Sequence, residues 1–213
     1  MKLVSYRDDG EASRTGVVLE AGILDVSEWI AAQAVSGGTQ EHCLRSGHPA
    51  DSGGMLRLLQ GGADVMRSLH VHVEQCQAQA ATCYQTLESV RLYPPVPRPG
   101  KVVAVGRNYA DHAKETGVAP FEKPRIIGKL ASCLSSPGAI VVCPDGVKKL
   151  DFEAELAVVI GDYGYCVPES RALEWAAGYS VLNDLSAREF QFDVSQPQTT
   201  FAKSMDGFCP MGP

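Results

Sequence analysis

A proline-rich segment near the middle of the chain limits its fold more than any other feature. The run Tyr93–Gly100, with the sequence YPPVPRPG, holds four prolines in eight residues. Each proline lacks a backbone N–H and restricts the residue before it, so this run can neither continue a helix nor enter a central strand. We therefore expect two domains, which comprise residues 1–95 and 96–213.

The N-terminal side of the boundary contains a strand-like pattern followed by a helix-like pattern. LVSY at residues 3–6 and GVVLEAGILDVSEWI at residues 16–30 alternate β-branched and polar positions between glycines, which is typical of short strands. Residues 55–90 carry Leu, Ala, Gln and Glu with apolar positions at helical spacing, and Gly61 and Gly62 break the pattern between two helices. A small α+β domain is the expectation.

The C-terminal side is richer in strand signals. VVAVG (102–106), RIIGKL (125–130), AIVVCP (139–144) and FEAELAVVIG (152–161) are short apolar runs that mostly end at Gly or Pro. Within the last run, LAVVI predicts a strand that is buried on both faces. ESRALEWAAGY (169–179) predicts a helix that ends near Gly178, and the strand SVLND follows it. The whole chain is therefore predicted to be α+β, and mainly β after the boundary.

Composition excludes several classes of function. The 213 residues are 45% hydrophobic and 21% charged, as in globular proteins, and 19 basic against 25 acidic residues give a net charge of −6. No Lys/Arg run is present to neutralise phosphates, so we expect no nucleic-acid partner. No apolar stretch approaches the roughly 18 residues that cross a bilayer, and the N-terminus becomes charged early, so neither membrane insertion nor export is expected.

The number and spacing of cysteines bear on the cellular compartment. The seven cysteines are odd in number, scattered, and never arranged as CxxC, so neither a disulfide framework nor a zinc site is indicated. A cytoplasmic location is expected, with the mitochondrial matrix as the alternative.

Three carboxylates at strand ends are the first candidate site. Glu153 and Glu155 point to the same face if they lie in a strand, because side chains alternate, and Asp184 ends the apolar run SVLND. Burial of such carboxylates without a counter-charge costs several kcal/mol each. They are therefore either solvated strand ends or oxygen ligands for a hard ion such as Mg²⁺, Mn²⁺ or Ca²⁺. Spacing alone leaves both readings open.

The segment GRNYADHAKE at residues 106–115 is the second candidate. If it forms a helical turn, His112 and Glu115 are three apart and lie on one face. A carboxylate beside an imidazole fixes its tautomer and raises its basicity, as a general base requires. The same residues also fit an ordinary exposed helical turn, and the spacing does not decide between the two.

Four segments in order carry a resemblance to a known family. GRNYADHAKE, DFEAELAVVIG (151–161), NDLSAREFQ (183–191) and FAKSMDGFCPMGP (201–213) resemble the fumarylacetoacetate hydrolase superfamily in its two-domain form. The resemblance spans Lys101 to Pro213 well, and the first hundred residues resemble the family's smaller domain more loosely. It implies a mixed β-roll catalytic domain in a homodimer.

The resemblance also implies roles for eight residues. Mg²⁺ or Mn²⁺ would be held by the three carboxylates Glu153, Glu155 and Asp184. A histidine–glutamate pair would act on a proton, and a lysine would neutralise developing negative charge: His112, Glu115 and Lys203. Two further residues would contact the substrate: Arg188 and Gln191.

The implied activity is hydrolysis of a C–C bond in a small-molecule 2-oxo acid or 1,3-diketone, similar to an acylpyruvate or fumarylpyruvate. The alternatives are an oxaloacetate-type decarboxylase, a hydratase or isomerase of ring-cleavage dienoates, and, in another class, an inactive fragment or scaffolding subunit. The family's catalytic domain continues through further strands with a GTP-x-GVG-like segment, so we expect this sequence to be truncated at its C-terminus.

Overall fold

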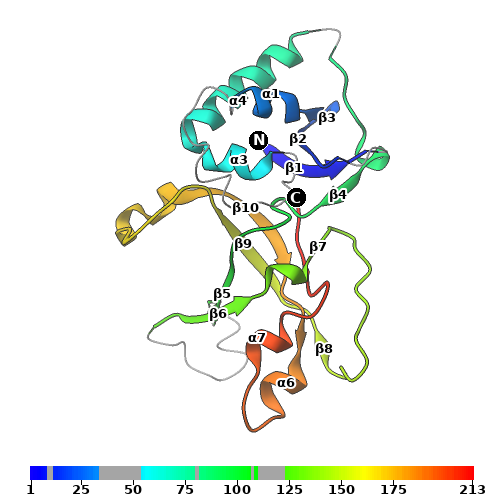
Figure 1. The fold of residues 1–213 in the computed structure, drawn as a ribbon, viewed down its shortest axis with the longest axis vertical. Coiled ribbons are helices and arrows are strands. Elements are labelled where there is room, and N and C mark those ends of the chain that lie inside the picture. The colour runs from blue at the N-terminus through cyan, green and yellow to red at the C-terminus, as the bar shows by residue number, and fades with distance from the viewer. Residues whose placement is uncertain (9–11, 34–53, 80–81, 107, 110–122) are drawn as a thin grey trace.

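The computed structural model describes all residues except 9–11, 34–53, 80–81, 107 and 110–122. Figure 1 shows the N-terminal sheet and helices grouped on one side of a long two-stranded ladder, with the remaining strands and short helices on the other side. In this part of the chain no helix has the length and apolar character needed to span a membrane.

The N-terminal region is built on a four-stranded antiparallel sheet in the order β3-β2-β1-β4. Its strands are β1 (Lys2–Arg7), β2 (Arg14–Leu19), β3 (Gly22–Asp25) and β4 (Arg91–Tyr93). Its helices are α1 (Ser27–Gln33), α3 (Met55–Gln60) and α4 (Gly62–Gln77), and a 3-10 turn covers Leu87–Ser89. The predicted break at Gly61 and Gly62 is thus confirmed.

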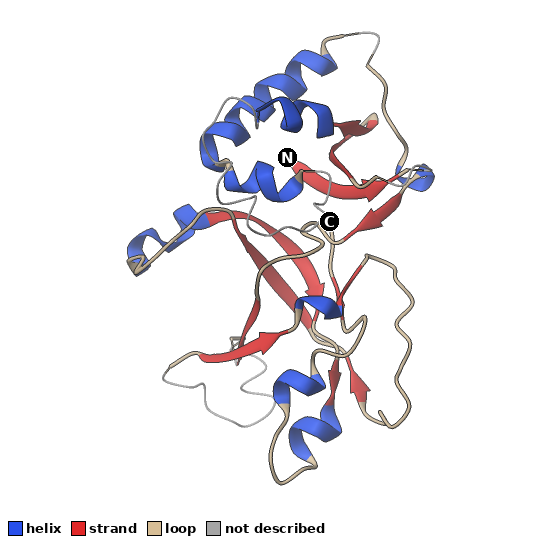
Figure 2. Ribbon diagram, in the orientation of Figure 1, coloured by secondary structure: helices blue, strands red, loops and turns tan. Residues whose placement is uncertain are grey.

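Alternation of side chains divides this sheet between two cores. Val4, Tyr6 and Ile23 are buried on one face. The opposite face packs against the helices through a larger cluster of buried residues: Val17, Leu24, Val26, Ile30, Met55, Leu58, Leu59, Leu69, Val73 and Val96. Figure 2 shows the helices gathered on this side of the sheet.

One predicted strand is a helix instead. The pattern through residue 30 indicates strands, but α1 begins at Ser27. The Asp25 carboxylate accepts the Ser27 backbone N–H through Oδ1 at 2.7 Å, which satisfies a donor that has no partner inside the helix. Ile30 then faces the core, so the apolar spacing of this segment serves a helix.

The C-terminal region consists of short two-stranded ladders. The antiparallel ladders pair β5 (Val102–Gly106) with β6 (Arg125–Lys129), β8 (Leu150–Asp151) with β11 (Ser186–Ala187), and β9 (Ala154–Ile160) with β10 (Ala176–Asn183). A parallel ladder pairs β7 (Leu134–Ser135) with β12 (Cys209–Pro210). The helices are α6 (Arg188–Phe192) and α7 (Thr199–Ala202), with 3-10 turns at Ala131–Cys133 and Glu169–Trp175.

Three predictions for this region fail in whole or in part. The run AIVVCP at residues 139–144 forms no strand. The segment LAVVI is not buried on both faces, because Leu156, Val158 and Ile160 are 60%, 48% and 62% exposed, while Ala157 and Val159 alternate with them and turn inward. In the described residues β9 pairs only with β10, and every second residue of β9 is exposed. The helix predicted for residues 169–178 is present as a seven-residue 3-10 helix, but it ends at Trp175, and Gly178 lies inside β10.

The two regions share one core. Val159 of β9 and Ala177 of β10 pack against the N-terminal cluster that includes Leu59. A Cβ atom at Gly161 would lie 2.5 Å from the Ala177 Cβ and 3.3 Å from the Leu59 carbonyl oxygen, so the absence of a side chain permits this close approach. Because side chains from both regions belong to one cluster, the division at residues 95 and 96 stays a prediction.

Candidate functional site

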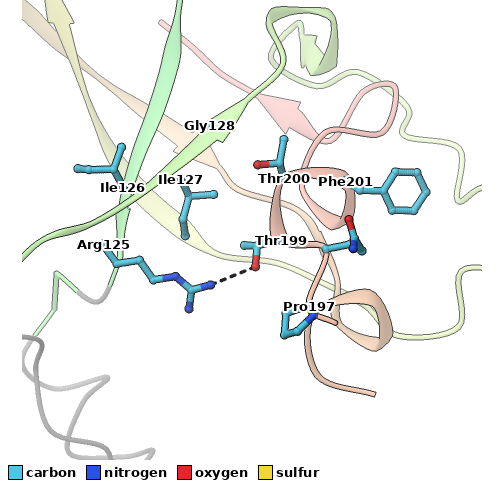
Figure 3. A pocket seen from close by; sticks show the side chains of 9 residues that line it. Arg125, Ile126, Ile127, Gly128, Pro197, Thr199, Thr200 and Phe201 are labelled. Carbon is cyan, nitrogen blue, oxygen red and sulfur yellow. Dashed lines mark hydrogen bonds between the residues drawn. The ribbon is translucent and has the colours of Figure 1, made fainter. Parts of the chain in front are cut away.

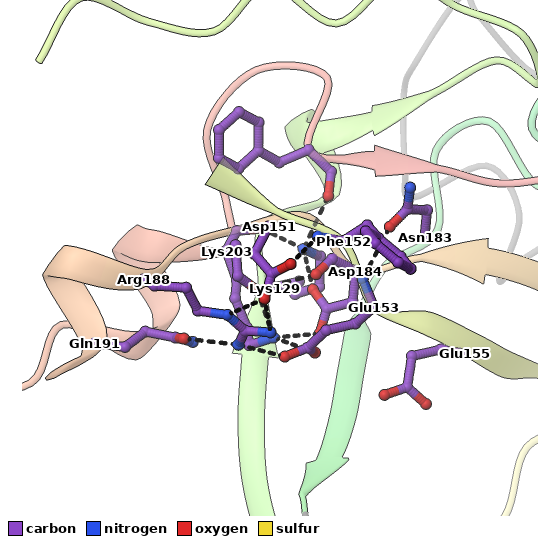
Figure 4. A network of polar contacts seen from close by, with 12 residues as sticks. Lys129, Asp151, Phe152, Glu153, Glu155, Asn183, Asp184, Arg188, Gln191 and Lys203 are labelled. Carbon is purple, nitrogen blue, oxygen red and sulfur yellow. Dashed lines mark hydrogen bonds and ion pairs between the residues drawn. The ribbon is translucent and has the colours of Figure 1, made fainter. Parts of the chain in front are cut away.

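A cluster of charged side chains forms where several short elements end on the side of β9 and β10 away from the N-terminal helices (Figure 4). Asp184 directly follows β10, Glu153 lies between β8 and β9, and Lys203 follows α7. Each of these charged residues lies just outside the end of a strand or helix, so its side chain can turn toward the other two. Three residues far apart in sequence are thereby brought into direct contact.

Lys203 is the centre of the cluster. Its Nζ donates to Glu153 Oε2 at 2.6 Å, to Asp184 Oδ2 at 2.8 Å and to Ser186 Oγ at 2.8 Å. The side chains of Lys203 and Asp184 are only 5% and 4% exposed. A buried ion pair is stable only when its remaining donors and acceptors are satisfied, and here all three ammonium hydrogens have acceptors.

Lys129 is a member of the site that the sequence interpretation missed. Its Nζ donates to Asp184 Oδ1 at 2.6 Å, to the Phe208 carbonyl at 3.2 Å and to the Lys203 carbonyl. The side chain is 1% exposed. A lysine that ends a strand run such as RIIGK is a weak signal alone, but a buried lysine needs a partner, and the Asp184 carboxylate is that partner.

Arg188 and Gln191 join the cluster from α6. Arg188 contacts Glu153 Oε1 at 2.5 Å, Asp151 Oδ2 at 2.8 Å and Gln191 Oε1 at 3.0 Å. Burial would lower the pKa of the Arg188 guanidinium, but the facing Glu153 and Asp151 carboxylates outweigh it and raise that pKa. The structure therefore gathers five of the eight expected residues: Glu153, Asp184, Arg188, Gln191 and Lys203.

Glu155 lies apart from this network in Figure 4. The Asn108 side-chain amide donates to Glu155 Oε2 at 3.5 Å, and the Tyr109 hydroxyl also binds this carboxylate and accepts the Leu156 backbone N–H at 3.1 Å. Burial raises the pKa of the Glu155 carboxyl, and the negative charges of Glu153 and Asp184 raise it further. The three carboxylates thus influence one another without sharing a direct contact.

The histidine–glutamate pair cannot be placed. His112 and Glu115 lie outside the described residues. The part of their segment that the structure describes, Asn108 and Tyr109, runs alongside Glu155.

The donor chemistry of the cluster fits a hard divalent cation. Glu153 and Asp184 offer carboxylate oxygens, which Mg²⁺ and Mn²⁺ prefer, and a positively charged ammonium already lies between them. Across the described ranges, no three His, Cys, Asp or Glu side chains are gathered closely enough to hold a metal ion. The full set of Glu153, Glu155 and Asp184 therefore stays a prediction.

A cavity of about 330 Å³ lies between β6 and α7 (Figure 3). Arg125 at one end donates to Thr199 Oγ1 at 3.3 Å, and Ile127 and Phe201 contribute to the walls. None of the expected site residues lines it. β6 ends at Lys129 and Lys203 directly follows α7, so the cavity borders the strand and helix that lead to the two buried lysines.

Comparison with known proteins finds enzymes among the relatives of this chain. The chain is 35% identical over 172 residues to the human mitochondrial oxaloacetate tautomerase FAHD2A, and the match covers 76% of this chain and 55% of that protein. A bovine relative of the same name is covered over 40% of its length, so the chain spans about half the length of these curated relatives.

Solved structures show the same fold. Maleylpyruvate hydrolase from Sphingobium sp. SYK-6, in complex with manganese(II) and pyruvate, matches with a TM-score of 0.71 and 25% identity over 100% of this chain and 66% of that one. A 5-carboxymethyl-2-hydroxymuconate delta-isomerase from Mycobacterium smegmatis matches with a TM-score of 0.53 and 39% identity over 62% of this chain and 50% of that one.

The relatives thus include a tautomerase, a hydrolase and an isomerase on one fold. The expected α+β fold is confirmed by these structures. The family model for the fumarylacetoacetate (FAA) hydrolase C-terminal domain matches residues 101–213, which is more than half of the sequence. The chain belongs to the fumarylacetoacetate hydrolase family.

Proposed function

We propose that this chain belongs to a Mg²⁺- or Mn²⁺-dependent hydrolase that cleaves a C–C bond in a 2-oxo acid carrying a 1,3-diketo group. The observation that carries the proposal is the buried contact of Lys203 with Glu153 and Asp184. Charged groups are rarely buried together unless they are paired, and sites with strongly interacting ionisable groups are functional candidates. The maleylpyruvate hydrolase crystallised with manganese(II) and pyruvate supports this chemistry.

The charge balance of the cluster supports a cation and an anionic substrate. Four carboxylates, Asp151, Glu153, Glu155 and Asp184, face three cations, Lys129, Arg188 and Lys203, which leaves one net negative charge. One divalent ion would turn this into one net positive charge. The carboxylate of a 2-oxo acid would then restore neutrality inside a site of low dielectric.

The chain's own residues divide the work. Glu153, Glu155 and Asp184 would hold the ion, which would supply a Lewis acid to polarise a substrate carbonyl oxygen. Arg188 and Gln191 would bind the substrate. Lys203 would offset negative charge that develops on the substrate as the C–C bond breaks, because preorganised cations stabilise such charge in a site that excludes water.

Water activation is assigned to His112, with Glu115 fixing its tautomer. The approach of Asn108 and Tyr109 to Glu155 supports this assignment. Three peptide units separate Tyr109 from His112, a span of at most about 11 Å between Cα atoms.

A second candidate function is keto–enol exchange of oxaloacetate, which the human relative favours. This reaction breaks no C–C bond and consumes no water, so it needs proton transfer at carbon but no attacking hydroxide. An oxaloacetate-type decarboxylase and a dienoate hydratase or isomerase stay as further alternatives. Replacement H112A should abolish hydrolysis and spare much of a decarboxylase activity.

The test is a product analysis with Mn²⁺ and two substrates, an acylpyruvate and oxaloacetate. Hydrolysis yields two carboxylic acids and incorporates ¹⁸O from labelled water, whereas tautomerisation changes the enol absorbance and leaves the mass unchanged. E153Q should abolish either activity, and E174Q, at an exposed glutamate that pairs with Arg171, should not. Equal activity of E153Q and the unmodified chain would contradict the assignment, and no turnover of either substrate would favour the inactive scaffold.

Assembly and location stay proposals. The homodimer implied by the family resemblance predicts twice the chain mass of 22.8 kDa in light scattering. A cytoplasmic location remains the proposal, and the name of the human relative makes the mitochondrial matrix the alternative for fractionation to test.

A further inference from the structure

Two lysines share the Asp184 carboxylate, one at each oxygen. Lys129 binds Oδ1 and Lys203 binds Oδ2, at 2.6 and 2.8 Å. We propose that Lys129 reserves Oδ1 and so restricts Asp184 to one oxygen for a metal, which makes the site prefer Mg²⁺ or Mn²⁺ over Ca²⁺. This inference rests on the proposed metal-dependent function and assigns Lys129 the role of a positioning residue.

Lys129 is fixed in a way that Lys203 is not. Its two acceptors besides Asp184 are backbone carbonyls, those of Lys203 and Phe208. Backbone acceptors cannot rotate away, and the three ammonium hydrogens have no donor capacity left. The Phe208 side chain beside this contact is fully buried, so the loop that carries the carbonyl is anchored in the core.

Further contacts hold residues 130–135, which follow Lys129, against residues 204–210. The Leu130 backbone N–H donates to Ser204 Oγ at 3.0 Å, and Ser135 Oγ donates to the Gly207 carbonyl at 3.0 Å. The parallel pairing of β7 with β12 follows directly. Backbone and side-chain hydrogen bonds between these two segments therefore hold Lys129 at Oδ1.

Lys203 has different partners. All three of its acceptors are side chains, and Glu153 and Asp184 are themselves expected metal ligands. Oδ2 is accordingly the oxygen that faces Glu153, and the one that a cation shared with Glu153 would use. Side-chain partners can rotate, so this ammonium can exchange contacts where Lys129 cannot.

The number of oxygens that Asp184 offers bears on cation choice. Ca²⁺ takes six to eight oxygen ligands and often uses carboxylates through both oxygens, whereas Mg²⁺ demands near-octahedral geometry with short single contacts. A carboxylate held at one oxygen by a buried ammonium suits the smaller ion. Removal of Lys129 would free Oδ1 and permit the two-oxygen contact that Ca²⁺ favours.

The experiment measures dissociation constants for Mg²⁺, Mn²⁺ and Ca²⁺ by titration calorimetry, without substrate. The variants are K129M and K129Q, and the matched control is K149M, which removes a lysine from an exposed ion pair with Asp193. We expect the ratio of the Mg²⁺ to the Ca²⁺ dissociation constant to rise about tenfold in both Lys129 variants and to stay unchanged in K149M.

The outcomes separate the two proposals. No binding of any of the three ions to the unmodified chain would contradict the proposed function itself. Binding by the unmodified chain with the same Mg²⁺ to Ca²⁺ ratio in the Lys129 variants would overturn the inference alone. Loss of a cooperative melt in both variants, even with saturating Mn²⁺, would make Lys129 a folding residue only and would also overturn it.

Discussion

Asp25 and Asp184 both accept several hydrogen bonds next to a strand end, but their surroundings differ. Asp25 accepts the Tyr6 hydroxyl and the Arg14 guanidinium at Oδ2, each at 2.8 Å, and the Ser27 N–H at Oδ1. The Asp25 carboxylate thus contacts one cation, Arg14, and two neutral donors, the Tyr6 hydroxyl and the Ser27 N–H. Asp184 contacts two ammonium groups, with Glu153 sharing one of them and Glu155 within electrostatic reach.

The difference separates a structural carboxylate from one suited to a ligand. Asp25 ties β3 to β1 and to the start of α1, and nothing in its contacts calls for a further charge. The cluster around Asp184 has its excess negative charge on the more exposed carboxylates, among them Asp151 and Glu153 at 47% and 25% exposure, where a cation can reach it. The same residue type thus stabilises the fold in one region and prepares binding in the other.

The largest expected difference between Asp184 and Asp25 is in cation binding. D184N should weaken Mn²⁺ binding by at least about 100-fold, because an amide oxygen carries no charge, whereas D25N should leave the dissociation constant within about twofold. Titration calorimetry on the two variants measures this. Similar losses in both would show that the Asp184 cluster is no more suited to a cation than the Asp25 cluster.

The next effect is on turnover. K203M should lower kcat by about 10²–10³, the size seen when one preorganised group facing developing charge is removed. The Mn²⁺ dissociation constant should not rise, because the loss of a cation beside Glu153 and Asp184 removes repulsion. Steady-state kinetics with parallel calorimetry test both expectations. A K203M variant that lost Mn²⁺ binding together with activity would assign Lys203 to assembly of the site.

The third effect is on stability and concerns the structural role of Asp25. D25N should lower the free energy of unfolding by about 2 kcal/mol, since hydrogen bonds to a charged group are stronger than neutral ones and Arg14 loses one of its two carboxylate partners and keeps Asp8. Urea unfolding followed by circular dichroism measures the change. A stability equal to that of the unmodified chain would make Asp25 dispensable to the sheet.

The smallest effect is a dependence on pH. Burial alone would raise the pKa of the Asp25 carboxyl, but hydrogen bonds from Ser27, Tyr6 and Arg14 lower it below its usual range. Stability from this group is therefore present above the unfolded carboxyl pKa of about 3.9 and is lost as the pH falls through the lower folded value. The stability difference between the unmodified chain and D25N should shrink below about pH 4. A difference that stayed constant down to pH 2 would contradict this sign.

Local signals in the sequence predicted most elements and part of the site. Glycine breaks and apolar spacing located α3, α4 and the strands β5, β6 and β9, because these features act over a few residues. Exposure of Leu156 and Ile160 could not be predicted, because β-branched and aliphatic runs look alike whether one face or both are covered.

The site shows the same limit. Glu153, Asp184 and Lys203 were expected through motif resemblance, and the structure brings them together. Lys129 was missed, because its role depends on a contact with Asp184 across 55 residues of sequence, which no local pattern records. Spacing placed Glu155 on the same side as Glu153, but whether it joins Lys203 or Asn108 depends on tertiary packing.

The ladder of β9 and β10 has a consequence for cooperativity. Near one end, Val159 and Ala177 belong to the N-terminal core, and at the other end β10 leads directly into Asp184. One continuous strand of eight residues thus joins the two regions. Loosening of the N-terminal helices would free the strand that positions Asp184, so the free energy that holds the first region together also maintains the geometry of the second.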